Sequence, residues 1–146
     1  MKRLFFSLSV LLTVIAAAAA ADPDPVSEEV KTSFKKEFPG AQVLSWSDVG
    51  ELVKATFLYS GYRSEAYFSP EGELQGSVRN IFYNQVPLAV SKAIDRRFED
   101  ADVLEVTEVT NTNGTSYVIR LESEKKKYKV QVDASGNTIR SEKVKK

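Results

Sequence analysis

The sequence predicts an α+β protein made of two tandem repeats, each with one helix packed on a roughly four-stranded antiparallel sheet. The main observation is an apolar stripe that occurs twice, 60 residues apart, with the i, i+4, i+8 spacing of one helix face. A second observation is that each stripe is followed by segments in which apolar and polar residues alternate, as in half-buried strands. The two stripes are Val30, Phe34 and Phe38, and Val90, Ile94 and Phe98.

The predicted helices begin and end at local signals. The first begins near Asp24 and Pro25, because an aspartate can cap free amides and proline suits the first helical turn. It ends at the Pro-Gly pair 39–40, since the residue before a proline is pushed out of the helical region. The second helix is expected to begin at Pro87.

Alternation predicts four strands after each helix, and Asn113-Gly114 is the strongest hairpin signal in the chain. Beyond this turn the spacing between the copies grows from 60 to 64 residues, so that Gly72 matches Gly136. The four extra residues are expected in a loop, where insertions cost little. The predicted strands span residues 43–48, 52–59, 62–68, 73–83, 103–110, 115–122, 126–133 and 138–144.

Residues 1–21 have the layout of a secretory signal peptide. Lys2 and Arg3 precede an apolar run, and a tract of alanines follows, which predicts cleavage near Ala20 or Ala21. The alternative is a transmembrane anchor, which is less favoured because alanine contributes little to membrane insertion. Cleavage leaves two predicted units, residues 22–84 and 85–146, in a periplasmic or secreted protein without a stable membrane anchor.

Composition limits the partners and the stability of the mature chain. Without Lys2 and Arg3, 18 basic residues face 20 acidic ones, so the net charge of about −2 gives no reason to expect nucleic acid. The chain contains no cysteine, so an exported protein of this sequence depends on its core alone. Half of it would be marginally stable by itself, and we therefore expect the two units to pack as one body.

The doubled pattern V-x3-F-x3-F-P-x-A-x-V-x2-W, with an export signal before it, resembles the PepSY-like family, and more narrowly its exported β-lactamase-inhibitor-like branch. The second copy departs from the pattern, with Glu99 in place of the proline and Val106 in place of the tryptophan. The resemblance implies an α+β fold, two tandem units, export, and binding or restraint of proteases. It carries no inhibitory residue to any position of this chain.

The residue types present argue against most catalytic chemistry. The absence of histidine and cysteine excludes Ser-His and Cys-His nucleophile pairs and zinc sites built on nitrogen or sulfur. Two S-x-x-K matches, beginning at Ser33 and Ser123, occur at chance frequency and lack the companion motifs of acyl enzymes. Glu65, Asp48 and Asp102 leave a small carboxylate-dependent hydrolase as an alternative, although such charges are usually solvated. No catalytic residue, cofactor or metal is predicted.

Three further features of the sequence receive structural interpretations. Trp46 is expected in the core, because its counterpart in the second copy is Val106. The lysines of 125–129, together with Lys143, Lys145 and Lys146, are expected to protect a sheet edge rather than to bind nucleic acid. Residues 133–137 contain several oxygen ligands but are interpreted as a turn, since they lack the ligand spacing of a calcium loop.

The predicted partner-binding surface lies on the sheet face turned away from the first helix. Tyr67 stands there between Arg63 and Glu65, with Thr56 and Leu58 on the neighbouring strand. Tyrosine and arginine are enriched at binding hot spots, and a sheet face without a helix can receive a partner. We therefore expect an exported, non-catalytic protein-binding or inhibitor-like module whose partner is an envelope or extracellular protein. Alternatives are the hydrolase and a structural envelope protein without a discrete partner.

Overall fold

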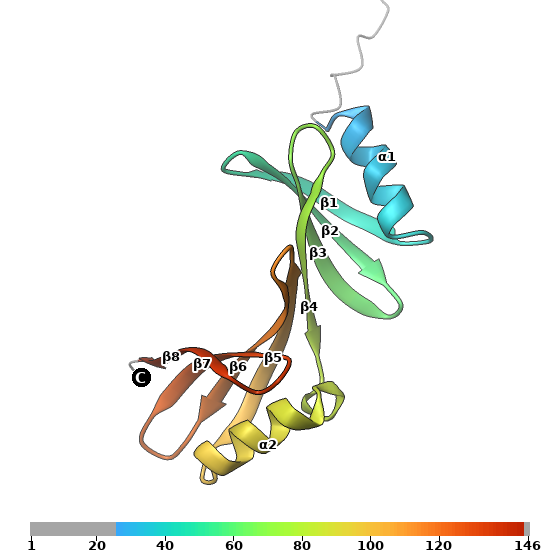
Figure 1. Cartoon of the computed structure of the whole chain (residues 1–146). Helices are drawn as coiled ribbons and strands as arrows, with labels where there is room; N and C mark the ends of the chain where they lie inside the picture. The colour runs from blue at the N-terminus through green and yellow to red at the C-terminus, as the bar shows by residue number, and fades with distance from the viewer. Residues whose placement is uncertain (1–25, 145–146) are drawn as a thin grey trace, which may run out of the picture.

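The computed structural model describes residues 26–144 and arranges eight strands in one antiparallel sheet, in which each strand pairs with its neighbour in the chain (Figure 1). Two helices and one 3-10 turn complete the described part. The elements are α1 (Glu28–Glu37), β1 (Gln42–Val49), β2 (Leu52–Tyr59), β3 (Tyr62–Phe68), β4 (Leu74–Ile81), η1 (Tyr83–Gln85), α2 (Leu88–Arg97), β5 (Asp102–Asn111), β6 (Gly114–Glu122), β7 (Lys127–Asp133) and β8 (Thr138–Val144).

The predicted fold class of two repeats, each with its own four-stranded sheet, is wrong. β4 pairs with β5 from Gly76 opposite Asn111 to Ile81 opposite Val106, and this ladder joins all strands into one sheet across the predicted boundary at residues 84 and 85. The physical reason is that separate sheets would leave two additional edges of unpaired backbone groups. Asn111, which the sequence assigned to a loop insertion, instead belongs to β5 and pairs with Gly76 in this ladder.

The first helix is capped one turn later than predicted. Ser27 is the N-cap, and its hydroxyl accepts a hydrogen bond from the Val30 amide at 3.3 Å. The predicted cap at Asp24 lies outside the described residues. The helix ends at Phe38, whose amide donates to the carbonyl of Phe34, in agreement with the predicted stop before the Pro-Gly pair.

The second helix begins at Leu88, directly after Pro87, as the sequence predicts. Pro87 gives no side-chain cap, and the helix is instead tied to the preceding turn. The Tyr83 hydroxyl donates to the Asp95 carboxylate at 2.8 Å and lies 3.2 Å from the Ser91 carbonyl. This tether raises the pKa of Tyr83, because burial and the neighbouring carboxylate both disfavour the phenolate.

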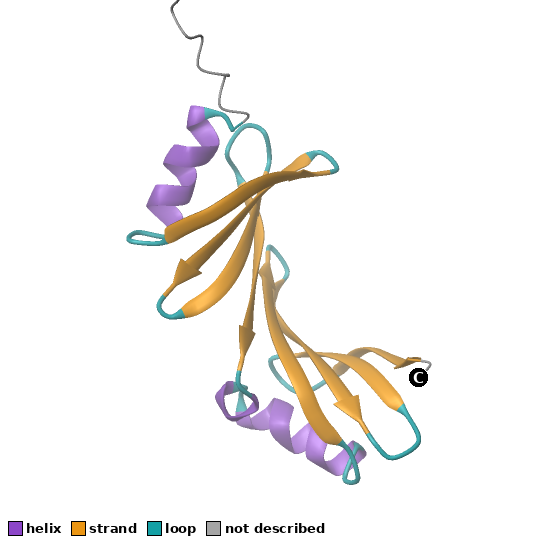
Figure 2. Cartoon of the chain, turned by 180° about the vertical axis from the view of Figure 1, so that it is seen from behind, coloured by secondary structure: helices purple, strands orange, loops and turns teal. Residues whose placement is uncertain are grey.

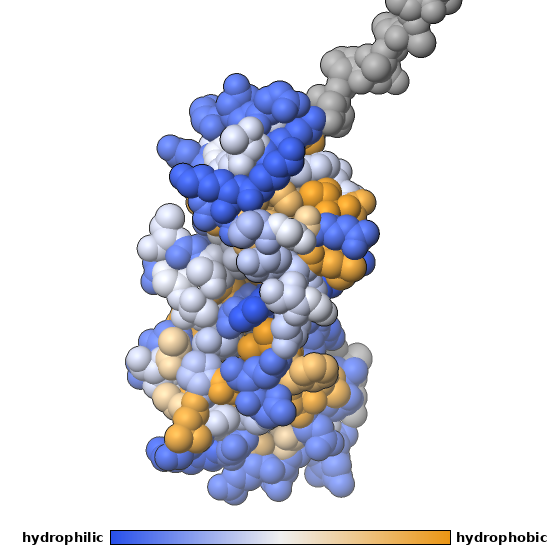
Figure 3. Space-filling view, turned by 90° about the vertical axis from the view of Figure 1, so that its right-hand side faces the viewer, coloured by the Kyte–Doolittle hydropathy of each residue, from blue (hydrophilic) through white to orange (hydrophobic). Residues whose placement is uncertain are grey.

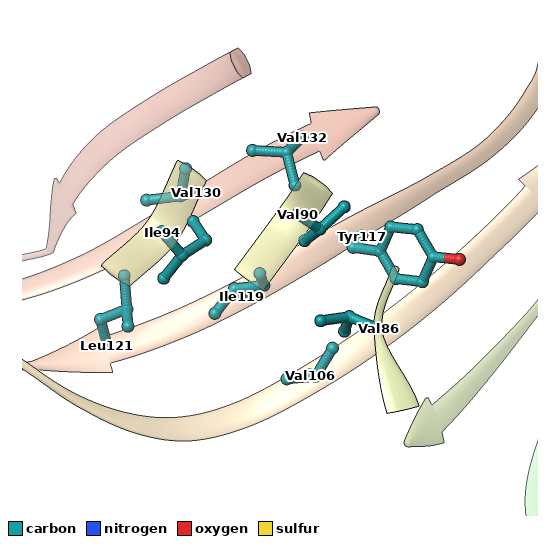
Figure 4. Packing of buried hydrophobic residues seen from close by; sticks show 9 residues of the cluster. All are labelled: Val86, Val90, Ile94, Val106, Tyr117, Ile119, Leu121, Val130 and Val132. Carbon is teal, nitrogen blue, oxygen red and sulfur yellow. The ribbon is translucent and has the colours of Figure 1, made fainter. Parts of the chain in front are cut away.

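Each helix packs on its own hydrophobic cluster. Under α1 the cluster is rich in aromatic side chains, with Phe34 and Phe57 at its centre, and Trp46 packs against it as predicted. Phe38 and Phe98, which the stripes predict to be buried, are only half-buried at the ends of their helices. The cluster under α2 is mainly aliphatic and consists of Val86, Val90, Ile94, Val106, Tyr117, Ile119, Leu121, Val130 and Val132 (Figure 4).

Both helices cover the same face of the sheet, near its two ends (Figures 1 and 2). Directly paired residues of neighbouring strands have their side chains on one face. One such row runs from Phe57 in the α1 cluster through the centre of the sheet to Val132 in the α2 cluster. The row is Phe57, Ser64, Arg79, Glu108, Tyr117 and Val132. The opposite side of the sheet carries no helix of the described chain, and we call it the open face.

Neither helix in residues 26–144 is long and apolar enough to cross a membrane. The predicted signal peptide and its cleavage site lie outside the described residues.

Candidate protein interface

The register brings the five predicted binding residues together on the open face. Thr56 lies directly opposite Glu65, and Leu58 directly opposite Arg63, while Tyr67 is two residues beyond Glu65 on the same side of β3. Thr56 is only 4% exposed, so it lies beneath the surface and supports its neighbours. Leu58 and Arg63 are exposed, and the other two residues are half-buried.

A hydrogen-bonded chain holds Tyr67 in one orientation. Its hydroxyl donates to one oxygen of the Glu65 carboxylate at 2.8 Å, and the other oxygen accepts from the Lys54 ammonium group at 3.4 Å. Lys54 lies directly opposite Tyr67, so these two hydrogen bonds connect β2 with β3. Burial, and then the Glu65 carboxylate, raise the pKa of Tyr67 to about 12. The phenol is therefore neutral at ordinary pH, and its ring is pre-positioned at the surface.

We expect this pKa to be visible in an alkaline titration. The pKa of Tyr67 rises on folding from its ordinary value of 10.0 to about 12, so the folded state favours the protonated phenol. Its contribution to stability is fully present below pH 10 and is lost as the pH rises towards about 12. Tyrosinate absorbance of the Tyr67→Phe variant, subtracted from that of the parent, should show a missing transition near pH 12. A missing transition centred near pH 10 would contradict the hydrogen bond to Glu65.

Arg63 differs from its neighbours because it makes no ion pair with any described residue. It lies beside a depression of about 260 Å³ on the open side of β3, β4 and β5. Glu65 and Val78 form part of the wall, and Asn80 and Thr107 bring polar groups from the next two strands. The arrangement offers a free guanidinium group at the rim of a hollow large enough for a side chain of a partner.

The structure adds residues of β4 and β5 that sequence reasoning missed. Val78 and Val109 lie directly opposite each other at the centre of the open face, in the same row as Glu65. Asn80 donates to Glu105 at 3.2 Å and accepts from the Thr107 hydroxyl at 3.0 Å. Their alternation is visible in the sequence. Val78 and Asn80 lie beside β3 through the pairing of β3 with β4, whereas Val109 and Thr107 reach the site only through the pairing of β4 with β5, which the two-sheet prediction excluded.

The half of the open face nearest β8 has most of its charges paired. Arg120 bonds to Glu105 at 3.0 Å, Lys127 lies 3.5 Å from Glu122, and Arg140 pairs with Glu142. For the 125–129 lysines the predicted protection of an edge is wrong, since β7 lies between β6 and β8, whereas Lys143 of the same predicted patch lies on the edge strand β8. Lys145 and Lys146 lie outside the described residues. The edge is β8, whose own charged residues occupy that position.

The helix-covered face has a polar seam between the two clusters. Arg79 of β4 donates to Glu108 of β5 at 2.7 Å, and its guanidinium carbon lies 5.4 Å from the centre of the Tyr62 ring. The Glu108 carboxylate raises the pKa of Arg79, while burial and the same carboxylate raise the pKa of Tyr117. A hollow of about 160 Å³ lies beside this seam, between it and Phe38. Because Arg79 and Glu108 satisfy each other, we interpret the seam as a bond between β4 and β5.

The carboxylates considered for hydrolysis do not converge. Asp48, Glu65 and Asp102 lie on β1, β3 and β5, and Glu65 is engaged by Tyr67 and Lys54. Within residues 26–144 no group of three or more possible metal ligands is present. In the same range no buried side-chain nitrogen or oxygen lacks a hydrogen-bond partner. The three carboxylates considered for hydrolysis therefore do not form one site within residues 26–144.

Residues 133–137 form a turn, as predicted. One oxygen of the Asp133 carboxylate accepts hydrogen bonds from the amides of Ser135 and Asn137, each at 2.9 Å. The other accepts from the side-chain amide of Asn137 at 2.9 Å. These donors lower the pKa of Asp133, with the Asn137 side chain first among them. The oxygen atoms that could have indicated calcium are thus used within the turn.

Comparison with known proteins identifies relatives by fold only. No protein-family model and no curated protein matches the chain. Solved structures do match. A DUF2874 family protein from Bacteroides uniformis is 22% identical with a TM-score of 0.74, and the match covers 81% of this chain and 89% of that one. A BLIP-like protein from Bacteroides fragilis is also 22% identical with a TM-score of 0.74, covering 83% and 88%. The chain shares their fold.

A third match is a protein from Bacteroides eggerthii, described as a presumed periplasmic protein. It is 23% identical, with a TM-score of 0.73 and coverage of 82% of this chain and 90% of that one. The description BLIP-like agrees with the β-lactamase-inhibitor-like part of the predicted resemblance. The PepSY-like part stays a prediction. The tandem-repeat part is wrong in the form predicted, because all eight strands form one sheet. At these identities the likeness shows the architecture, and the functional argument depends on the open face.

Proposed function

We propose that this protein is an exported, non-catalytic protein-binding module that docks its partner on the open face over β2, β3 and β4. The observation that carries the proposal is the pairing of a fixed aromatic side chain with a free cation. Tyr67 is held by Glu65, and Arg63 stands unpaired beside the 260 Å³ depression on the same strand. No described helix covers this area.

The energetics of binding favour such a patch. Fixing a rotamer-rich side chain costs roughly 0.5–1.5 kcal/mol when a complex forms, and the hydrogen bond to Glu65 removes much of that cost for Tyr67 in advance. Tyrosine and arginine are also enriched among hot-spot residues. Val78 and Val109 supply an apolar centre next to them. The patch thus combines an aromatic anchor, an apolar centre and a polar rim.

The chemistry of the patch indicates what its partner presents. An unpaired guanidinium group binds a carboxylate through parallel hydrogen bonds. The depression beside it has the polar groups of Asn80 and Thr107 in its wall together with Val78. We infer a folded envelope or extracellular protein with an acidic residue for Arg63 and a small amide or apolar side chain for the depression. Inhibition of an enzyme is one outcome of such docking.

Export and the lack of catalysis are parts of the same proposal. Residues 1–21 have the signal-peptide pattern, and one fold relative is described as presumed periplasmic. A chain without histidine or cysteine, whose candidate carboxylates lie on separate strands, is suited to binding rather than to bond cleavage. We therefore assign the mature chain to the periplasm or the extracellular medium, without a cofactor.

The tagged mature chain, residues 22–146, is first used to capture partners from an envelope extract. Binding of the purified partner is then measured by titration calorimetry. Tyr67→Ala should weaken binding by about 2 kcal/mol, or roughly 30-fold, while Tyr67→Phe, which keeps the ring, should lose less. Arg63→Ala should mainly slow association and make it less dependent on salt. Lys36→Ala, on the exposed side of α1, is the control and should bind like the parent.

The outcome that contradicts the proposal is a partner that binds the Tyr67→Ala variant as tightly as the parent chain. Circular dichroism of each variant separates this result from unfolding. A variant that unfolds would instead place Tyr67 in the core, which disagrees with its position on the open face.

A further inference from the structure

The two edges of the sheet are protected to very different degrees. β1 and β8 are the edge strands, and each has one side without a strand partner in the described chain. β8 carries Arg140, Glu142 and Lys143, and charged side chains on an edge discourage pairing with other chains. β1 has eight residues, of which Asp48 is the only charged one. The unprotected edge is therefore β1.

The exposed side of β1 is apolar for an edge. Val43 and Val49 are 38% and 45% exposed, and the strand has no proline or lysine. A bulge at Leu44 interrupts the pairing with β2 near the start of the strand, and residues 45–49 continue in unbroken register. Trp46, at the middle of the strand, packs edge-on against Phe34 at 5.4 Å and is still half-exposed.

The sequence of this edge is nearly the same in both directions. Residues 43–49 read Val-Leu-Ser-Trp-Ser-Asp-Val, so valine stands at both ends and serine on each side of Trp46. In an antiparallel pair centred on Trp46, Ser45 faces Ser47 of a second copy. The bulge at Leu44 puts Val43 and Val49 on opposite faces, so the regular pairing is confined to residues 45–47. Asp48 lies opposite the bulge at Leu44, and β1 has no other charged residue, so no like charges meet. Such self-complementarity is what a two-fold interface requires.

We propose that β1 pairs with β1 of a second copy of this chain, antiparallel and centred on Trp46, so that the two sheets become continuous. Both indole rings then lie on the helix-covered side, next to each other across the two-fold axis. The ladder is short, and its interface is smaller than the roughly 1,200 Å² of stable complexes, so the dimer is weak and concentration-dependent. The open face stays accessible in this dimer, and the inference does not depend on the proposed function.

Trp46 is the only tryptophan of the chain and reports directly on this contact. Sedimentation velocity and tryptophan emission of the mature chain should be followed from about 1 µM to about 1 mM, a range that covers weak association. We expect a dimer at high concentration and a red shift of the emission on dilution. Ser47→Lys, which places a charge on the edge of β1, should keep the chain monomeric, as should Ser45→Lys. Ser141→Lys on β8 is the matched control and should dimerise like the parent.

The absence of cysteine makes the register testable as well. Mixing the Ser45→Cys and Ser47→Cys variants under mild oxidation should give a disulfide-linked dimer, because the pairing places these positions opposite each other. Each variant alone should cross-link far less. If the chain stays monomeric over the whole concentration range, the proposal is overturned. It is also overturned if the Ser47→Lys variant still dimerises while the Ser141→Lys variant does not. Cross-linking of the single variants in preference to the mixture overturns the register centred on Trp46.

Discussion

Replacing Phe34 by alanine is expected to lower the free energy of unfolding by roughly 3–5 kcal/mol, the usual cost of removing a buried aromatic ring. Phe34 is 3% exposed and lies at the centre of the α1 cluster. Its ring contacts four others at centroid distances from 4.9 to 6.3 Å, and the site cannot collapse without moving the helix. The four rings belong to Phe38, Trp46, Phe57 and Phe68.

Phe38→Ala is the matched comparison, because it removes an identical ring from the same helix end. Phe38 is half-buried, so its removal takes fewer contacts from the core and leaves a cavity that opens to solvent. We expect a loss of about 1–3 kcal/mol, less than for a fully buried ring. Urea denaturation followed by circular dichroism measures both variants. A larger loss for Phe38→Ala than for Phe34→Ala would show that the helix is rotated relative to the sheet.

Local pattern was sufficient to predict the individual elements. Period-two alternation placed the strands close to their observed limits, and β2, β3 and β8 have the predicted bounds. The predicted hairpin is present, but its two turn residues are Thr112 and Asn113, since Asn111 pairs with Gly114. These features depend on residues near each other in the chain, whose preferences are expressed in any sheet.

The pairing of β4 with β5 could not be predicted in the same way. It joins segments separated by η1 and α2. The alternation of apolar and polar residues in a strand does not indicate which other strand it pairs with. The spacing change between the copies was visible, but it was assigned to a loop. Asn111 in fact extends β5 to the position opposite Gly76. An insertion that lengthens both strands of a hairpin changes the spacing between the two copies by the same number of residues as an insertion in its turn.

The candidate site shows the same division between local and non-local information. Alternation was enough to place Arg63, Glu65 and Tyr67 on one face of β3. The bond from Tyr67 to Glu65 joins residues two apart on that face, and it could have been anticipated. Val109 and Thr107 could not have been anticipated, because they reach the site from β5.

Replacing Gly136 by alanine should destabilise the protein for two separate reasons. Gly136 lies in the turn between β7 and β8 with φ of +86°, a conformation that costs other residues about 1–2 kcal/mol. A Cβ atom there would also overlap the carbonyl oxygen of Ala89 in α2 and approach Ala93. Relieving this overlap moves the turn away from the helix, and overpacking of this kind costs typically 1–3 kcal/mol. We expect a total loss of roughly 2–5 kcal/mol in urea denaturation.

Gly50→Ala separates the two contributions. Gly50 has φ of +61° in the turn between β1 and β2, and a Cβ atom there meets nothing within 4 Å. Its substitution therefore carries only the backbone strain of about 1–2 kcal/mol, reduced by the lower entropy of an alanine in the unfolded chain. The difference between the two variants measures how tightly the turn is held against α2. Equal losses would mean that the contact with Ala89 gives way without cost and that the helix is not fixed by this turn.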